Sequence, residues 1–140
     1  MKDMPRGVRC DRPVELLDVY PTLVEAGLVS KKTDEHLDGL SLLPWLAAPA
    51  LEKERPAITT LYAHNHSVVD TRYRYTRYAD GSEELYDRQS DPHEFDNPMD
   101  CVWDQPQLKT VVDKLALWIP KEEAGEPDLV GISRKSRPKN

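Results

Sequence analysis

The feature that most constrains the fold is a run of alternating basic and aromatic residues followed by an Asp-Gly pair. Residues 71–78 read TRYRYTRY, and Asp80-Gly81 separates them from a second run at 83–87. The alternation places Tyr73 and Tyr75 on one face of a strand and Arg72, Arg74 and Thr76 on the other, which is typical of a half-buried antiparallel strand. Asp-Gly between two such runs predicts a β-hairpin.

Three segments therefore predict strands, over 57–62, 67–78 and 83–87. Apolar residues at helical spacing predict a helix over 107–119, which Pro120 ends. We expect an α+β fold, in which a small antiparallel sheet of three or four strands is packed by this C-terminal helix. In the sheet, Leu85 is expected to point inward.

A second apolar pattern near the N-terminus predicts a helix over about 18–27, preceded by a partly helical approach and stopped by Gly27. Pro21 lies inside this pattern. Either the helix kinks at Pro21, or Asp18 is the N-cap and Pro21 belongs to the first turn.

The next segment predicts a turn and a short helix. Asp38-Gly39 is typical of a turn, and Ser41 is a candidate cap for one helical turn that carries Trp45. We expect Trp45 and, in the C-terminal helix, Trp118 to be core anchors. We expect an entry loop over residues 1–12, the folded region over 13–120 and a disordered tail over 121–140.

Composition excludes several classes of protein. The 140 residues carry a formal net charge of −6, and the basic residues are mixed with acidic ones, which argues against nucleic acid as a partner. No stretch approaches the roughly 20 apolar residues that cross a bilayer, and the N-terminus lacks the apolar core of a signal peptide. Neither a membrane nor a compartment is indicated.

The two cysteines do not form a motif. Cys10 and Cys101 have no second cysteine nearby, which excludes a Cys-x-x-Cys metal or redox site. Two free thiols are expected, with a disulfide between these two residues as the alternative.

Motifs in three regions of the chain carry a further signal. The first is VELLDVYPTL at 14–23, which continues to Ala26-Gly27-Leu28. The second is LDGLSL at 37–42. The third is YRYTRYADGSEELYD at 73–87, followed by DPHEFDN at 91–97.

In this order and spacing, the motifs resemble the C-terminal subdomain of a type I sulfatase, especially the iduronate-2-sulfatase-like group of the alkaline phosphatase superfamily. The resemblance covers roughly residues 13–120 and extends to the helix exit at 118–121. It implies a sulfuric ester hydrolase that acts on sulfated sugars, in a family that is often periplasmic, secreted or lysosomal. An intact enzyme of this kind would be expected to use calcium and a formylglycine.

The motifs that carry this family's chemistry are not found in the sequence. The resemblance implies a nucleophile in Cys/Ser-x-Pro-x-Arg, but the residues after Cys10 read DRPV and those after Cys101 read VWDQ. No catalytic residue and no metal ligand are therefore assigned to this chain. We expect it to be inactive alone and to need a sulfatase N-terminal catalytic core as its partner.

Four residues remain candidates for contact with a sulfated carbohydrate: His64, Asn65, His66 and Arg72. Residues 64–66 have three interpretations. A His-x-His pair on a strand can place both rings on one face to bind a metal. The family resemblance implies instead a loop that faces the substrate, and the third interpretation is a polar loop that binds no ligand. Arg72, Arg74 and Arg77 offer guanidinium forks for sulfate, or they pair with acidic residues across the sheet such as Glu83 or Glu84.

Two alternatives to a sulfatase fragment stay open at this point. One is a non-enzymatic module that binds a separately encoded partner through an apolar face, which a missing parent domain would leave exposed. The other is a carbohydrate-binding module that uses residues 64–74.

Overall fold

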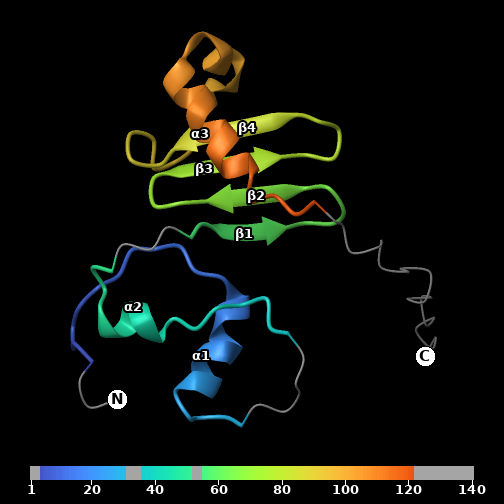
Figure 1. The fold of residues 1–140 in the computed structure, drawn as a ribbon. Helices are drawn as coiled ribbons and strands as arrows, with labels where there is room; N and C mark the ends of the chain where they lie inside the picture. Colours follow the sequence, from blue (N-terminus) through green and yellow to red (C-terminus); the bar gives the residue numbers. More distant parts are fainter. Residues whose placement is uncertain (1–3, 31–35, 52–54, 122–140) are drawn as a thin grey trace, which may run out of the picture.

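The computed structural model describes residues 4–30, 36–51 and 55–121. Within these residues the chain forms two parts (Figure 1). Residues 4–30 and 36–51 make up the helical part, and residues 55–121 make up the sheet part. The two parts meet at the edge of the sheet formed by strand β1 (Figure 1).

The sheet part confirms the predicted α+β fold. Four antiparallel strands lie in the order β1-β2-β3-β4, with β1 at Ala57–Thr60, β2 at His66–Val69, β3 at Tyr73–Arg77 and β4 at Glu83–Asp87. Helix α3, at Pro106–Ala116, crosses one face of this sheet (Figure 1). A 3-10 helix, η2, at Pro98–Asp104, connects β4 to α3.

The single strand predicted over 67–78 is wrong, because the chain turns between β2 and β3. The Asp70 Oδ1 atom accepts hydrogen bonds from the backbone N–H groups of Arg72 and Tyr73, at 2.7 and 2.6 Å. An Asx side chain that binds the backbone two residues on creates a turn without Gly or Pro. The alternating pattern continues through this turn, so it conceals the reversal.

The predicted β3–β4 hairpin is confirmed. Gly81 has a positive φ of 86°, which residues with a Cβ rarely adopt, and the Asp80 carboxylate accepts a hydrogen bond from Ser82 N at 2.9 Å. The register pairs Tyr75 with Leu85, so both side chains lie on the face that α3 covers.

The core lies between this face and α3. It consists of six buried residues, Val68, Tyr75, Leu85, Val102, Val112 and Leu115. The prediction that Trp118 is a core anchor is wrong, since α3 ends at Ala116 and the Trp118 side chain is 40% exposed. Val102 belongs to η2, an element that the sequence patterns did not predict.

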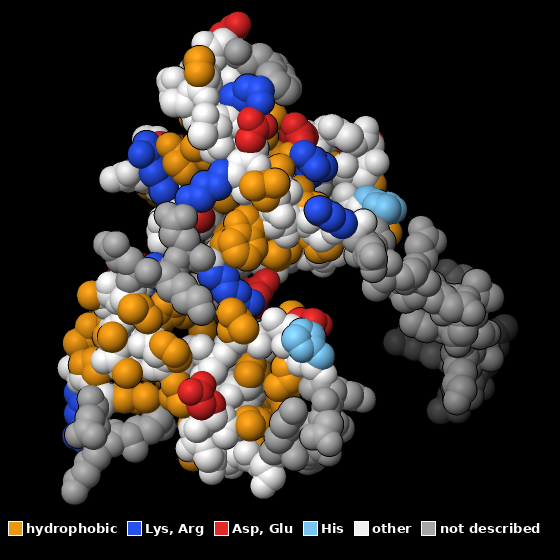
Figure 2. All heavy atoms as spheres, in the orientation of Figure 1, with side chains coloured by type: hydrophobic (Ala, Val, Ile, Leu, Met, Phe, Trp, Pro, Cys, Tyr) orange, Lys and Arg blue, Asp and Glu red, His pale blue; other side chains and the backbone are white. Residues whose placement is uncertain are grey.

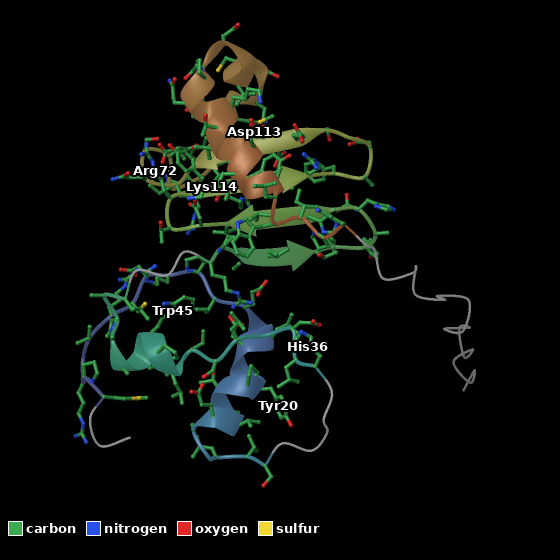
Figure 3. All side chains as sticks on the ribbon, in the orientation of Figure 1. Tyr20, His36, Trp45, Arg72, Asp113 and Lys114 are labelled. Atoms are coloured by element: carbon green, nitrogen blue, oxygen red, sulfur yellow. The ribbon has the colours of Figure 1, made fainter. Side chains whose placement is uncertain are left out.

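The helical part contains a 3-10 helix, η1, at Leu16–Asp18, helix α1 at Val19–Glu25 and helix α2 at Leu43–Ala47. The partly helical approach is thus confirmed, and Pro21 lies in the first turn of α1 behind the N-cap Asp18. Trp45, in α2, is buried as predicted (Figure 3). Ser41 accepts a hydrogen bond from Leu43 N at 3.3 Å, although Leu42 occupies the N-cap position itself.

Cys10 is exposed, Cys101 is half-buried and both are free thiols, so the alternative of a disulfide between them is not realised. In the described part of the chain, no helix has the length and apolar character needed to cross a membrane. Apart from Lys121, the predicted tail lies outside the described residues.

Candidate functional site

Three of the four candidate residues lie in or next to the loop that joins β1 to β2. In this loop, residues 61–65, Tyr62 and His64 have positive φ angles of 56° and 63°. Such angles are uncommon for residues other than Gly and cluster at functional sites. Asn65 holds the loop, because its amide group donates to Ala63 O at 2.9 Å and accepts from Ala79 N at 3.2 Å.

The loop borders a pocket of about 360 Å³ on the face of the sheet opposite α3. One row of directly paired residues, Thr59, Ser67, Thr76 and Glu84, crosses all four strands there. The pocket is lined by these four residues together with Leu61, Tyr62, Asn65, His66, Arg74 and Tyr78. It therefore combines hydroxyl, amide, carboxylate and guanidinium groups with an aromatic ring, Tyr62, that is 72% exposed.

Hydrogen bonds organise the polar groups of this pocket. Thr76 Oγ1 donates to Ser67 Oγ at 3.1 Å, and Tyr78 Oη donates to Glu84 Oε2 at 3.0 Å. Burial, and then the hydrogen bond to Glu84, raise the pKa of Tyr78 above its ordinary value. Arg74 pairs with Glu94 and stacks on the ring of Tyr86, with 5.3 Å from Cζ to the ring centroid.

The two histidines have different environments. His66 begins β2 and is 3% exposed, and its Nδ1 atom lies 3.0 Å from Thr60 Oγ1. His64 lies in the loop with its side chain exposed. In the segments that the structure describes, no group of three or more His, Cys, Asp or Glu residues is arranged to hold a metal ion. The calcium that the family resemblance implies belongs to an intact enzyme rather than to these residues, and it stays a prediction.

Arg72 lies at the opposite end of β3 from this loop (Figure 3), because His66 pairs with Arg77 at the near end. It forms two parallel hydrogen bonds to Asp87, from Nε to Oδ1 at 3.0 Å and from Nη2 to Oδ2 at 2.6 Å. The Arg72 hydrogen bond is the main reason why the pKa of Asp87 is lowered to about 2. The structure therefore does not bring Arg72 together with residues 64–66.

The predicted pairing of the arginines with acidic residues is found, although only one of the named partners is used. Arg77 Nε donates to Glu83 at 2.9 Å, whereas Arg72 pairs with Asp87 and Arg74 with Glu94. Glu94 lies in a loop beyond β4, so cross-strand alternation could not identify it.

A second site joins the two parts of the chain. The Arg55 guanidinium donates to both carboxylate oxygens of Asp18, at 2.7 and 2.8 Å, and also to Glu15. Asp18 is 0% exposed. A pocket of about 470 Å³ beside Arg55 is lined on its other walls by residues that include Arg12, Asp70, Lys114 and Trp118. Sequence reasoning missed Arg55, because one arginine in the segment between Pro49 and Pro56 belongs to no periodic pattern or motif.

Comparison with known proteins identifies relatives of this chain. No family model matches it. A curated protein described as a sulfatase, from Formosa agariphila, is 37% identical over 123 residues, which are 87% of this chain and 23% of the relative. The chain is thus a homologue of sulfatases over most of its length, and it spans about a quarter of that relative.

Solved structures agree with this relationship. The phosphonate monoester hydrolase of Agrobacterium radiobacter superposes with a TM-score of 0.50 and 25% identity, over 71% of this chain and 24% of that protein. A protein from a Bacteroides thetaiotaomicron locus for glycosaminoglycan metabolism gives a TM-score of 0.52 at 22% identity, over 70% of this chain and 24% of that protein, and supports the fold alone. Both coverages are consistent with the predicted C-terminal subdomain.

Proposed function

We propose that this chain supplies the carbohydrate-facing portion of a sulfatase-type sulfuric ester hydrolase and is inactive without a catalytic core. The observation that carries the proposal is the pocket bordered by residues 61–65, in a chain whose sequence is homologous to sulfatases over 87% of its length. Sugar hydroxyls both donate and accept hydrogen bonds, as the hydroxyl and amide groups of this pocket do.

The inactivity follows from the chemistry that sulfate ester hydrolysis requires. The reaction needs a positioned nucleophile and a cation or cationic group that stabilises developing charge. Cys10 lies outside any Cys-x-Pro-x-Arg sequence, and no cation ligand cluster is present among the described residues. We therefore assign binding to this chain and the bond-breaking step to another part of the enzyme.

The ligand contacts are assigned to residues that remain accessible. Tyr62 presents an exposed ring on which the apolar face of a sugar can stack, and His64 is exposed beside it. His66 is almost fully buried, so we assign it to the support of the loop. Arg72 lies at the far end of β3 and its guanidinium already pairs with Asp87. It can therefore contact the same ligand only if the substrate extends around the sheet.

The test is a titration of the purified chain with glucosamine 6-sulfate and, separately, with unsulfated glucosamine, followed by NMR. Chemical-shift changes in residues 61–66 with the sulfated sugar are expected, and Tyr62→Ala should abolish them. Phe95→Ala removes an exposed ring from another loop and serves as the control. The absence of shifts in this loop contradicts the binding role, and hydrolysis of 4-methylumbelliferyl sulfate by the chain alone contradicts the assigned inactivity.

A further inference from the structure

The pocket beside Arg55 lies at the opposite end of β1 and β2 from the loop at residues 61–65. Asp70 and Thr71, from the turn after β2, line it together with Arg55, which precedes β1. These residues meet at one end of the sheet because Ala57 pairs with Val69, whereas the loop joins the other ends of the same strands. In the described part of the chain, this pocket shares no lining residue with the pocket at residues 61–65. The two are therefore separate cavities.

The charges that line the pocket beside Arg55 favour an anion. Three of its four ionisable lining residues, Arg12, Arg55 and Lys114, are basic, and the fourth is Asp70, although the whole chain has a net charge of −6. Arg55 is already paired with Asp18. We therefore assign the attraction for a ligand to Arg12, from the N-terminal segment, and to Lys114, in the last turn of α3. Basic side chains from distant segments that meet at one pocket raise its potential and attract anions.

An apolar wall completes the pocket on the side of α3. Trp118 lines it and is 40% exposed, and Leu115 and two prolines line it as well. The indole of Trp118 is thus available to a ligand, because it does not belong to the buried core of the sheet part. Figure 2 shows a hollow between the sheet part and the helical part, with basic side chains beside it. A flat indole can stack against the apolar face of a sugar ring.

Asp70 and Thr71 add groups that suit hydroxyls. The turn after β2 uses only the Oδ1 atom of Asp70, which accepts from the backbone N–H groups of Arg72 and Tyr73. A carboxylate repels an anionic group but accepts hydrogen bonds from hydroxyls, and the Thr71 hydroxyl both donates and accepts. The volume of about 470 Å³ lies within the range of pockets that hold small organic ligands. These features favour a ligand that combines hydroxyls, a ring and a negative charge.

We propose that the pocket beside Arg55 binds an anionic sugar unit, a pyranose ring that carries a carboxylate or a sulfate group. Arg12 and Lys114 bind the anionic group, the ring stacks on Trp118, and Asp70 and Thr71 bind ring hydroxyls. This site goes beyond the proposed function, which concerns the loop at residues 61–65 and does not depend on it. The chain then contacts sugars at both ends of the strands β1 and β2.

The test is a titration of the full chain with glucuronic acid, with N-acetylglucosamine 6-sulfate and with neutral N-acetylglucosamine, followed by NMR. Shifts of the Thr71 amide and the Trp118 indole N–H are expected with an anionic sugar and not with the neutral one. A response to one anionic sugar alone identifies carboxylate or sulfate as the recognised group. No response to either, or an equal response to the neutral sugar, overturns the proposal.

Variants test the assigned contacts. Lys114→Gln and Arg12→Gln should each raise the dissociation constant by about tenfold, the loss of one charge-assisted hydrogen bond. Lys109→Gln is the matched control, because this half-exposed lysine of the same helix pairs with Asp113 and lies outside the pocket. An equal effect of Lys109→Gln contradicts a specific site. Inorganic sulfate that binds as tightly as the sulfated sugar contradicts recognition of the ring.

The two sites are read out separately. Tyr62→Ala should leave the shifts of Thr71 and Trp118 unchanged, because Tyr62 does not line the pocket beside Arg55. Trp118→Ala should abolish binding at that pocket and leave the shifts of residues 61–66 unchanged. Shifts confined to residues 61–66 therefore contradict this proposal alone, and shifts confined to Thr71 and Trp118 contradict only the proposed function.

Discussion

The sheet part and the helical part of this chain are stabilised by different kinds of interaction. The sheet part buries a cluster of six apolar or aromatic residues between two layers. The helical part buries the indole of Trp45 and the carboxylate of Asp18, while most of its large apolar side chains remain exposed. The sheet part is therefore held by an apolar core, whereas the helical part is held largely by directional polar contacts around Asp18.

The largest expected effect is on the sheet core. Leu85→Ala should destabilise the sheet part by about 2–5 kcal/mol, because it removes packed atoms and leaves a cavity between β4 and α3. Urea unfolding followed by circular dichroism measures this change. Leu117→Ala, at an exposed position just past α3, should change the unfolding free energy very little, and a similar loss for both variants would contradict the assigned core.

A smaller and more local effect is expected at the junction. Asp18→Asn should cost about 2–3 kcal/mol, because the hydrogen bonds from Arg55 and the backbone lose their charged acceptor inside the chain. Hydrogen exchange should show faster exchange at Leu40 and Ile58 while Tyr75 and Leu85 remain protected. Asp11→Asn, at an exposed acidic residue, is the control.

The same junction predicts a dependence on pH. Burial by itself would raise the pKa of Asp18, but the hydrogen bonds from Glu15 N, Arg55 and Leu40 N outweigh it and lower the pKa. Because the folded-state pKa lies below the unfolded one, the stabilisation is complete above about pH 4 and is lost as the pH falls through the folded value. Acid should therefore open the helical part of the native chain, and Asp18→Asn should remove this component.

Gly39→Ala should cost about 1–3 kcal/mol, since an added Cβ would lie 2.0 Å from the carbonyl oxygen of Leu17. The loop at 38–40 would have to move, and Leu40 N would lose its hydrogen bond to Asp18. Faster exchange at Leu40 with unchanged exchange in β2 and β3 is expected. Asp38→Ala, which adds no atoms at the close approach, should have little effect.

The smallest effect is expected at Arg72, which is half-exposed. Arg72→Ala should raise the pKa of Asp87 from about 2 toward its ordinary value of ~3.9, which an NMR titration measures directly. The stabilisation that Arg72 provides is present above about pH 4 and disappears as the pH falls toward 2. An unchanged Asp87 pKa would show that the paired geometry does not persist in solution.

Local patterns in the sequence predict most of the sheet part. Alternation places Tyr73 and Tyr75 on one face of a strand, and Asp80-Gly81 identifies the hairpin, because both signals arise within a few residues. The turn at Asp70 was missed, since an Asx turn inside an alternating run leaves the period unchanged. Trp118 was misplaced because the apolar spacing continues after the helix has ended.

The structure brings some of the candidate site residues together and separates another. The segment 64–66 was singled out from its residue types, and the structure places it beside a pocket. The structure does not place Arg72 near residues 64–66, because the chain reverses between β2 and β3 and Arg72 lies at the far end of the sheet. The pocket residues Thr59, Ser67 and Thr76 come from three different strands, so only the strand register shows that they meet.

The sequence by itself determined most elements of this protein, although not η2 or the break between β2 and β3, because helical spacing, strand alternation and turn residues act between close neighbours. It also determined the relationship to sulfatases, because that relationship rests on motifs that follow one another in a fixed order along the chain. Only the tertiary structure decided that Asp18 is buried with Arg55 and that the apolar face of α1 points outward. A helical period shows that a helix has two faces, but which face turns inward depends on groups far away in the chain: here the Leu40 amide and the Arg55 guanidinium.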